Sequence, residues 1–505
     1  MIGALGVGSS SGRHVRSELP PKPDGYYPDD YQQEETTDRT GENYTEIREN
    51  RFVKALDRPF STFGIDVDTA SYTIARSYLE EGMEVPPEVV RIEEFVNYFT
   101  YDYPEPDDEH PFSVTTEMAQ CPWNFSNKLM LVGIQGKHVD ISDAPRANVV
   151  FLIDVSGSMR NDLRLVKRSL DFLIDSLRPE DQVAIVVYAG ASGLVLDSTP
   201  GNEKEKIRAA VEDLEAGGST AGAAGINLAY KIAQDNFIQN GNNRVVLITD
   251  GDFNVGVSSE QQLKRLIEKK RESGVFLSCL GVGRGNYQDA KMEQLADNGN
   301  GNYSYIDRLS EAKRVFKEEF TSTILTIAKD VKVQLEFNPA FVKRYRLLGY
   351  ENRRLAREDF DDDKKDAGEL GSGHSVTVLC EIVPADGKLD TESGKYVQTE
   401  LTTEAMESGE AGTLRLRYKE PDGKVSKLIE TSLPYAPHSF EEASDSLRFA
   451  SAVVEFALLL RKSDFAGSAD AEHALEIARS CTGFDPWGRR AEFLDMIISH
   501  IALTR

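Results

Sequence analysis

The chain has 505 residues, of which 40% are apolar, 9% aromatic and 28% charged. This length predicts about two to four domains, and the composition is too apolar for a disordered chain. The 84 acidic and 58 basic residues give a formal net charge of -26. That charge argues against nucleic-acid binding and against docking on an anionic membrane, because phosphates would be repelled. No run of about 18 apolar residues occurs, so we expect no transmembrane helix.

The cysteines and the N-terminus give little further information. Cys121, Cys279, Cys380 and Cys481 are far apart and show no CxxC spacing, so the sequence predicts neither a zinc site nor a disulfide framework. Residues 1–12 lack the basic start and the strong apolar centre of a signal peptide. The compartment is therefore left open.

The first 145 residues divide into a tail and a flanking region. Residues 13–50 are rich in Pro, Asp, Glu, Thr and Tyr, so we interpret residues 1–50 as a disordered tail, with order beginning near Arg51. In the flanking region, 51–145, short helices are predicted at 71–82 and 91–99. Residues 112–122 and 128–137 alternate between apolar and polar side chains, which predicts strands at the edge of a larger unit.

Residues 146–325 alternate continuous apolar runs with amphipathic segments. Strands are predicted at 148–154, 182–189, 244–250, 275–283 and 302–306. Helices are predicted up to residue 177 and near 203–215, 221–234, 259–273 and 289–297. The apolar face of the first helix comprises Leu163, Val166, Leu170, Leu173 and Leu177. Strands that are apolar on both faces and alternate with such helices indicate a parallel sheet covered on both sides, a doubly wound α/β domain.

Residues 326–505 are predicted to form a C-terminal region with strands within 329–435 and helices within 438–504. The predicted strands are 330–337, 342–350, 374–383 and 413–419, and the predicted helices are 446–463, 471–480 and 489–503. The first of these helices is apolar nearly all round, so we expect it to be buried. The acidic stretch 358–366 lacks the DxDxDG pattern of a calcium loop and is interpreted as a solvated loop.

Oxygen-bearing side chains occur in three loops that follow or lie beside predicted elements of the middle domain. Asp154, Ser156 and Ser158 lie in DVSGSM, Thr220 lies in GGSTAGAAG, and Asp250 lies in ITDGDFN. In open α/β sheets, ligands bind beyond the carboxyl ends of the strands. Two carboxylates and three hydroxyls, with no His or Cys among them, favour Mg²⁺ or Ca²⁺ over zinc or copper. Two further residues just beyond Asp250 are either hydrogen-bond partners of this site or turn residues: Asp252 and Asn254.

Simpler or different interpretations exist for each motif. One DxSxS loop alone could merely cap a helix, but three matching loops together favour a metal site. Asp66 and Asp68 mimic the start of haloacid-dehalogenase-type phosphatases, yet Ala70 stands where Thr or Val is needed. We expect Asp68, Thr69 or Ser71 to cap the following helix instead. No base is recognisable near Ser156, and no GxSxG or GxxxxGK[ST] motif occurs, so the chain is predicted not to be an enzyme.

Asp154, Ser156 and Ser158, with Thr220 and the TDG sequence at Asp250, resemble the metal-ion-dependent adhesion site (MIDAS) of von Willebrand factor type A domains. The flanking sequences FSTFGIDVDTASYTIARSYLEEG, GYENRRL and DFDDDKKDAGELGSGH resemble those of the bacterial YfbK-like proteins. The resemblance implies a central doubly wound, Rossmann-like α/β domain, an α+β N-terminal flank and a C-terminal flank that is β-rich and then helical. Many members of this family look exported or lipid-anchored, which points to the cell envelope or periplasm.

The resemblance implies metal-dependent protein binding. Asp154 and Asp250 would hold and charge-balance a Mg²⁺ ion, with Ca²⁺ or Mn²⁺ as alternatives. Ser156, Ser158 and Thr220 would supply direct oxygens, and an Asp or Glu of a partner protein would complete the coordination sphere. Two alternatives stay open: a metal-dependent hydrolase, and a structural module whose flanks supply the last ligand. The negative surface would repel an acidic partner, although salt limits this to about 8 Å.

Overall fold

The computed structural model of the chain describes residues 35–37, 41–189, 192–218, 222–251, 260–285, 287–319, 325–365, 367–385, 401–421, 423–481 and 483–505. None of the helices within these ranges combines the length and the apolar character that a membrane crossing requires. The four cysteines are all buried and unpaired, in agreement with the absence of a predicted disulfide framework.

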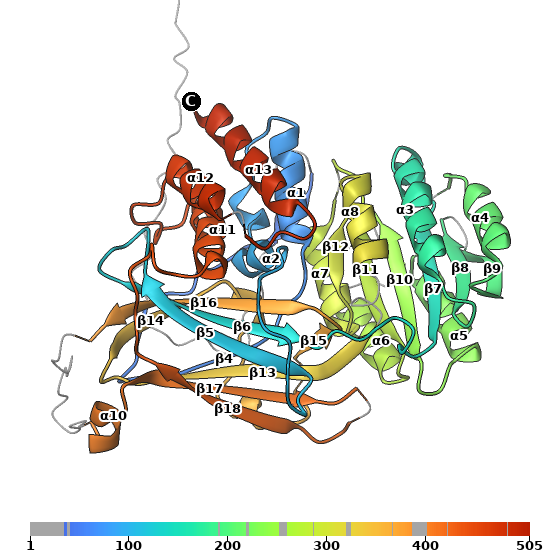
Figure 1. The fold of residues 1–505 in the computed structure, drawn as a ribbon. Coiled ribbons are helices and arrows are strands. Elements are labelled where there is room, and N and C mark those ends of the chain that lie inside the picture. The colour runs from blue at the N-terminus through green and yellow to red at the C-terminus, as the bar shows by residue number, and fades with distance from the viewer. Residues whose placement is uncertain are drawn as a thin grey trace, which may run out of the picture. The chain divides into compact units, whose positions relative to one another are not determined.

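A six-stranded sheet forms the middle of the chain, with the strand order β12-β11-β10-β7-β8-β9 (Figure 1). Its five parallel strands are β7 (Ala147–Asp154), β8 (Gln182–Tyr188), β10 (Asn242–Thr249), β11 (Phe276–Gly281) and β12 (Tyr303–Tyr305). The prediction of a parallel, doubly wound sheet is confirmed. The antiparallel edge strand β9 (Ser192–Pro200) was not predicted, because its half-exposed side chains do not form a continuous apolar run.

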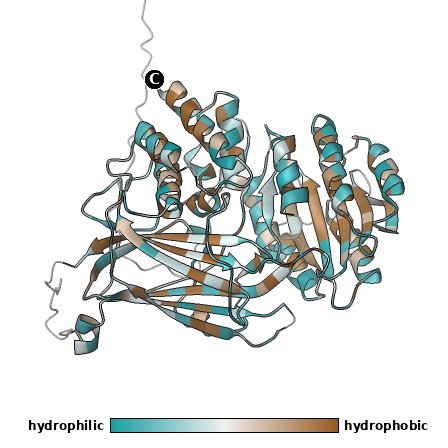
Figure 2. Cartoon of the chain, in the orientation of Figure 1, coloured by the Kyte–Doolittle hydropathy of each residue, from teal (hydrophilic) through white to brown (hydrophobic). Residues whose placement is uncertain are grey.

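Helices cover both faces of this sheet. One face carries α3 (Leu163–Ser176), α4 (Lys204–Glu212) and α8 (Leu309–Lys313), which continues into the π-helical turn η3 (Arg314–Glu318). The other face carries α5 (Gly222–Asp235), α6 (Glu260–Arg271) and α7 (Asp289–Asn298). Side chains of β7 alternate between the two cores, with Phe151 on one side and Leu152 on the other. Figure 2 shows these apolar strands beside helices that carry many hydrophilic residues.

The segments before and after the central domain build two further sheets together. Before it lie β3 (Val53–Lys54), β4 (Phe60–Gly64), β5 (Phe112–Gln120) and β6 (Lys128–Gly136). After it lie β13 (Thr326–Phe337), β14 (Val342–Leu348), β15 (Gly368–Gly371), β16 (Ser375–Pro384), β17 (Glu410–Lys419) and β18 (Lys427–Pro434). One sheet has the order β3-β14-β16-β6-β5, and in the other β4 pairs with β13. Of the two strands predicted before the central domain, β5 lies at an edge and β6 lies inside.

The flanking helices also come from both ends of the chain. The first flank supplies α1 (Ala70–Glu80), η1 (Pro87–Val89) and α2 (Ile92–Asn97). The second supplies the turns η4 (Glu351–Arg353) and η5 (Glu358–Phe360) and the helices α10 (Thr403–Glu407), α11 (Asp445–Arg461), α12 (Ala471–Ser480) and α13 (Arg489–Thr504). Helix α11 contacts α2 and α13 contacts α1. The prediction that α11 is buried nearly all round is confirmed.

Ordered structure begins earlier than the composition predicts. Residues 43–45 form β2 (Asn43–Thr45), which pairs with β1 (Glu35–Thr37). The carboxylate of Glu42 is fully buried and accepts hydrogen bonds from the hydroxyls of Tyr44 and Tyr78, each 2.6 Å away, and from Arg284 at 3.0 Å. A polar, acidic stretch thus becomes ordered because distant residues satisfy its side chains, which composition alone does not reveal.

Candidate metal centre

The first loop of the candidate site leaves the carboxyl end of β7. The Asp154 carboxylate is fully buried, and its Oδ1 accepts the backbone N–H of Ser156 at 2.8 Å. The hydroxyl oxygens of Ser156 and Ser158 lie 2.9 Å apart. Ser156 is buried whereas Ser158 is exposed, so this loop reaches from the core to solvent. The turn η2 (Ser158–Arg160) follows directly.

The second loop is bound to the first through backbone hydrogen bonds. The N–H of Gly217 donates to the carbonyl of Val155 at 2.7 Å, and the N–H of Gly157 donates to the carbonyl of Gly218 at 3.3 Å. Thr220 lies outside the described residues, as do Asp252 and Asn254 of the third loop. The part of the second loop that precedes Thr220 therefore contacts the DxSxS loop, and the role of Thr220 itself stays a prediction.

The third loop leaves β10, which pairs in parallel with β7 so that Ile248 lies opposite Ile153. The hydroxyl of Thr249 donates to Oδ2 of Asp154 at 2.9 Å and accepts the N–H of Gly251 at 3.1 Å. Both oxygens of Asp154 are thus oriented by neighbours. Asp250 is buried beside them. Gly251 has φ of +81°, and a Cβ there would lie 2.9 Å from the backbone nitrogen of Gln288, so glycine is required where this loop meets the start of α7.

The electrostatics of this edge are dominated by carboxylates. Burial raises the pKa of Asp154, the charge of Asp250 raises it further, and hydrogen bonds from Ser156 and Thr249 oppose the shift. Burial, followed by the charge of Asp250, also raises the pKa of Asp162. Neighbouring carboxyl groups with a raised pKa repel each other once they are ionised, and a cation between them would relieve this repulsion.

Two residues at this edge were missed by the sequence analysis, Thr249 and Asp162. Asp162 directly precedes α3, and its Oδ2 lies close to the loop after β11, where a Cβ on Gly283 would be 2.8 Å away. Its position directly before the predicted helix that follows the DxSxS loop could have identified Asp162 from the sequence. The Thr of the TDG sequence was visible as well, but only the pairing of β7 with β10 gives it a role.

The aspartates near α1 serve a different purpose from the one predicted. Thr69 is the N-cap residue of α1 and makes no side-chain capping hydrogen bond, and the N–H of Ser71 donates to Glu94. The expectation that Asp68, Thr69 or Ser71 caps the helix is therefore correct for the N-cap position of Thr69, but the expected side-chain capping hydrogen bond is not made. Asp66 and Asp68 instead accept hydrogen bonds from Arg353, at 2.9 and 3.0 Å, a partner almost 290 residues away that the local sequence does not indicate.

The acidic stretch 358–366 is fixed to the neighbouring sheet as well as exposed to water. Arg417 pairs with Asp361 at 2.8 Å and with Asp363 at 3.1 Å, and the Lys332 ammonium donates to the carbonyl of Asp359 at 2.9 Å. Arginine and lysine therefore hold the described part of this loop. Throughout the described ranges, no three His, Cys, Asp or Glu side chains gather closely enough to hold a metal ion by themselves. A cation at the β7–β10 edge would hence need hydroxyl or water oxygens too.

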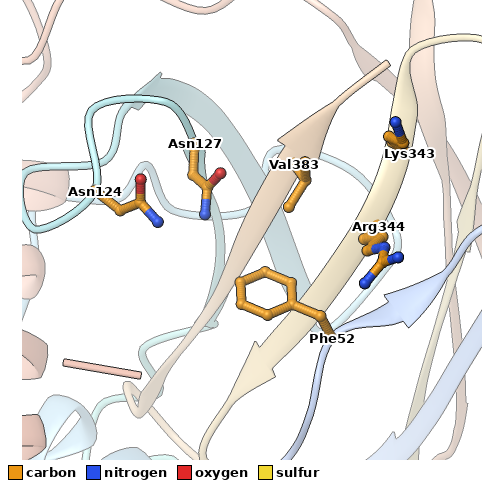
Figure 3. A pocket seen from close by; sticks show the side chains of 6 residues that line it. All are labelled: Phe52, Asn124, Asn127, Lys343, Arg344 and Val383. Atoms are coloured by element: carbon orange, nitrogen blue, oxygen red, sulfur yellow. The ribbon is translucent and has the colours of Figure 1, made fainter. Parts of the chain in front are cut away.

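A separate open pocket of about 430 Å³ lies beside β14 and the turn between β5 and β6. Figure 3 shows the side chains that line it: Phe52, Asn124, Asn127, Lys343, Arg344 and Val383. None of the described residues of the candidate metal site is among them. Both cationic residues of the pocket, Lys343 and Arg344, have interaction partners within the protein.

Comparison with known proteins agrees with this architecture. Residues 148–318 match the model of the von Willebrand factor type A domain, residues 38–131 match a second von Willebrand factor model, and residues 322–503 match the C-terminal region of the uncharacterized protein YfbK. The Escherichia coli K12 protein YfbK, described as uncharacterized, is 42% identical over 463 residues, which are 90% of this chain and 80% of that protein.

Two further similarities are more distant. The uncharacterized protein sll0103 of Synechocystis is 23% identical over 316 residues, 61% of this chain and 70% of that protein. A solved von Willebrand factor type A structure from Catenulispora acidiphila covers 79% of this chain and 91% of its own, with a TM-score of 0.45 and 17% identity. The family matches and the identity with YfbK confirm the resemblance drawn from the motifs. The chain therefore belongs to the YfbK family, and it carries a von Willebrand factor type A domain between two flanking regions.

Proposed function

We propose that the central domain binds a divalent cation, Mg²⁺ in the first instance, at the carboxyl edge of β7 and β10, and that it uses this ion for reversible association with a protein. Domains of the von Willebrand A type typically mediate metal-dependent protein–protein interaction. The proposal assigns that role to Asp154, Ser156, Ser158, Thr220 and Asp250 of this chain.

The observation that carries the proposal is the environment of Asp154. Its carboxylate is buried, both oxygens are held by hydrogen bonds, and Asp250 adds a second negative charge close by. Burying like charges together costs free energy that a cation removes. The hydroxyls of Ser156 and Ser158 are hard donors beside this carboxylate, as Mg²⁺ prefers.

The five residues would divide the work. Ser156, Ser158 and Thr220 would supply direct oxygens, while Asp154 and Asp250 would hold and charge-balance the ion, directly or through water. An Asp or Glu of the partner would complete the coordination sphere. The exposed position of Ser158 supports access from solvent. Because the chain carries a net charge of -26, a partner surface that is basic around a central acidic residue fits best.

Metal binding is tested first by thermal unfolding with and without Mg²⁺. At about 100 times its dissociation constant the ion adds about 2.7 kcal/mol if only the folded state binds it, so the wild-type chain gains stability. Ser156→Ala loses this gain, and Ser142→Ala keeps it, because the exposed Ser142 precedes the opposite end of β7 from the three loops. A wild-type chain that shows no Mg²⁺-dependent gain contradicts the proposal.

The role of the ion is tested by affinity capture with the full chain in Mg²⁺ and in EDTA, with Ser156→Ala as the matched bait. Partners that are retained only by the wild type in Mg²⁺ support metal-dependent association. A metal-dependent gain in stability without metal-dependent partners identifies the internally capped structural module instead. Turnover of generic phosphate or peptide substrates that Asp154→Ala abolishes identifies a hydrolase.

A further inference from the structure

Carboxylates surround three arginines where the two flanks meet the central domain. Arg91 of the first flank pairs with Glu94, Asp289 and Glu293. Arg353 of the second flank pairs with Asp66, Asp68 and Asp297. Arg461 at the end of α11 pairs with Glu351 at 2.7 Å and lies 3.9 Å from Glu49. We call these side chains, together with Glu93, the acidic joint.

Glu93 adds a ninth carboxyl group to three guanidinium groups. It is 1% exposed, and its Oε2 has no hydrogen-bond partner within the described part of the chain. Gly349 packs directly on it, since a Cβ there would lie 2.5 Å from Oε2, and its φ of +82° also requires glycine. The glycine backbone thus leaves room for the carboxyl group of Glu93, but no described residue donates a hydrogen bond to its Oε2.

Six of these nine carboxyl groups are buried, namely those of Asp66, Asp68, Glu93, Glu94, Asp289 and Glu293, and their excess over three guanidinium groups has to be compensated. The centre of the joint is dry, because the side chains of Glu94, Asp66 and Asp289 are at most 2% exposed. Carboxylates of this kind either surround a cation or hold protons. The guanidinium groups of Arg91, Arg353 and Arg461 balance only part of this charge, so we expect some of the remaining carboxyl groups to hold protons.

We propose that the acidic joint is a proton-dependent lock between the central domain and its flanks, closed while several of its carboxyl groups are protonated and loosened as the pH rises. The inference concerns the flanks and does not depend on metal binding at Asp154. Its physical basis is the ratio of carboxyl to guanidinium groups, together with the buried Glu93, whose Oε2 has no hydrogen-bond partner among the described residues.

The groups that face the joint from each neighbouring element agree with this proposal. The pKa of Glu93 is raised to about 8, chiefly by burial and additionally by the charges of Glu351, Asp66 and Glu94, whereas Arg461 opposes the rise. Burial also raises the pKa of Glu94 to about 8 against the pull of Arg91, with Asp66 and Glu293 adding to the rise.

Two acidic groups of α7, Glu293 and Asp297, also have a raised pKa. Burial raises the pKa of Glu293 to about 7, with Asp289 and Asp297 adding to the rise and with Arg91 and Arg353 opposing it. Groups whose pKa is higher in the folded than in the unfolded state bind extra protons on folding. The loss of folding stability that these groups cause therefore begins above the unfolded pKa of about 4.5 and is complete once the pH exceeds about 8.

A second set of ion pairs between the first flank and the central domain shows a pKa shift in the opposite direction. Arg76 of α1 pairs with Asp307 and Glu311 at 2.8 and 2.9 Å, and Arg314 pairs with Glu311 at 2.6 Å. These two arginines overcome burial and lower the pKa of Glu311 to about 2. Alkaline loosening should thus be confined to the acidic joint, and the contact around Arg76 provides an internal reference.

The experiment compares full-length wild type, Glu93→Gln and Glu205→Gln between pH 5.5 and 9. Glu205 is the control because its side chain is 92% exposed. The wild-type melting temperature should fall by at least about 3 °C over this range. Glu93→Gln, which mimics the protonated acid, should match the wild type at pH 5.5 and exceed it at pH 9, whereas Glu205→Gln should follow the wild type.

Hydrogen exchange, with labelling times scaled for the intrinsic pH dependence, locates the change. Peptides covering residues 91–97 and 289–298 should lose protection at pH 9 in the wild type, while 309–318 should not. A flat wild-type profile, an equal fall in Glu93→Gln, or equal loss of protection in both regions overturns the proposal. If Glu93→Gln does not fold, Glu293→Gln and the wild-type exchange pattern decide the question.

Discussion

Replacing Thr249 by Val tests whether the hydrogen bonds at the edge of the sheet prepare Asp154 for a cation. Val keeps the shape of Thr but removes its hydroxyl. In the wild type this hydroxyl donates to Oδ2 of Asp154 at 2.9 Å and accepts the N–H of Gly251 at 3.1 Å. The substitution therefore removes one hydrogen bond to the Asp154 carboxylate and one from the third loop. It replaces none of the five proposed ligand residues.

The structure sets the size of the effect. A hydrogen bond to a charged group contributes about 1.5–3 kcal/mol, and about 1.4 kcal/mol corresponds to a factor of ten in affinity. Thr249→Val should weaken Mg²⁺ binding by about 10- to 100-fold. The buried N–H of Gly251, left without its acceptor, should also lower the stability of the metal-free protein by about 1–3 kcal/mol.

Isothermal titration with Mg²⁺ measures the affinity, and urea unfolding in EDTA measures the stability. Thr249→Ser is the matched control, because it keeps the hydroxyl and loses only a methyl group; its Mg²⁺ affinity should stay within about threefold of the wild type. A folded Thr249→Val protein that binds Mg²⁺ as tightly as the wild type would refute the assignment of this hydrogen bond to the metal site.

Two further predictions concern stability. Glu311→Gln should cost about 1.5–3 kcal/mol in urea unfolding at pH 7, because it removes a carboxylate shared by the buried Arg76 and Arg314, which keep Asp307 and Glu319 as partners; since the folded pKa of Glu311 is about 2, the wild-type contribution should persist down to about pH 4.5 and be lost towards pH 2, and a loss that does not depend on pH in this window would contradict it. Gly301→Ala should prevent stable folding, because its Cβ would lie 1.8 Å from the carbonyl oxygen of Leu277, whereas Gly217→Ala meets nothing within 4 Å and should unfold at a urea concentration close to that of the wild type; equal midpoints for the two variants would contradict the clash.

The sequence was most informative where local periodicity decides the structure. The central parallel sheet was predictable because β7, β8 and β10 are buried on both faces and read as uninterrupted apolar runs. The edge strand β9 was not, since Leu194 and Val195 are exposed. The pairing of β6 with β16 and of β4 with β13 joins segments separated by the whole central domain, and no local pattern specifies such partners.

The candidate site shows the same division. Asp154, Ser156 and Asp250 were predicted as site residues because strand ends of a parallel sheet lie at one edge; Asp154 accepts hydrogen bonds there from Ser156 and Thr249. The roles of Thr249 and Asp162 depend on which strand lies beside β7 and on the loop after β11. The capping prediction at Asp68 failed for a related reason: a buried Asp beside a helix start looks like a cap until a distant Arg353 is seen to bind it.

The acidic joint also changes how the net charge of the chain should be interpreted. The formal value of -26 counts every carboxyl group as ionised, but on our proposal Glu93, Glu94 and Glu293 share protons near neutral pH. These groups are buried between elements of both flanks and the central domain, so they contribute less to the field at the surface than their number implies. An acidic partner residue that approaches Ser158 would then respond mainly to charges within about 8 Å of it. Within that radius a bound cation outweighs the distant acidic surface, which reconciles a strongly acidic protein with recognition of an acidic side chain.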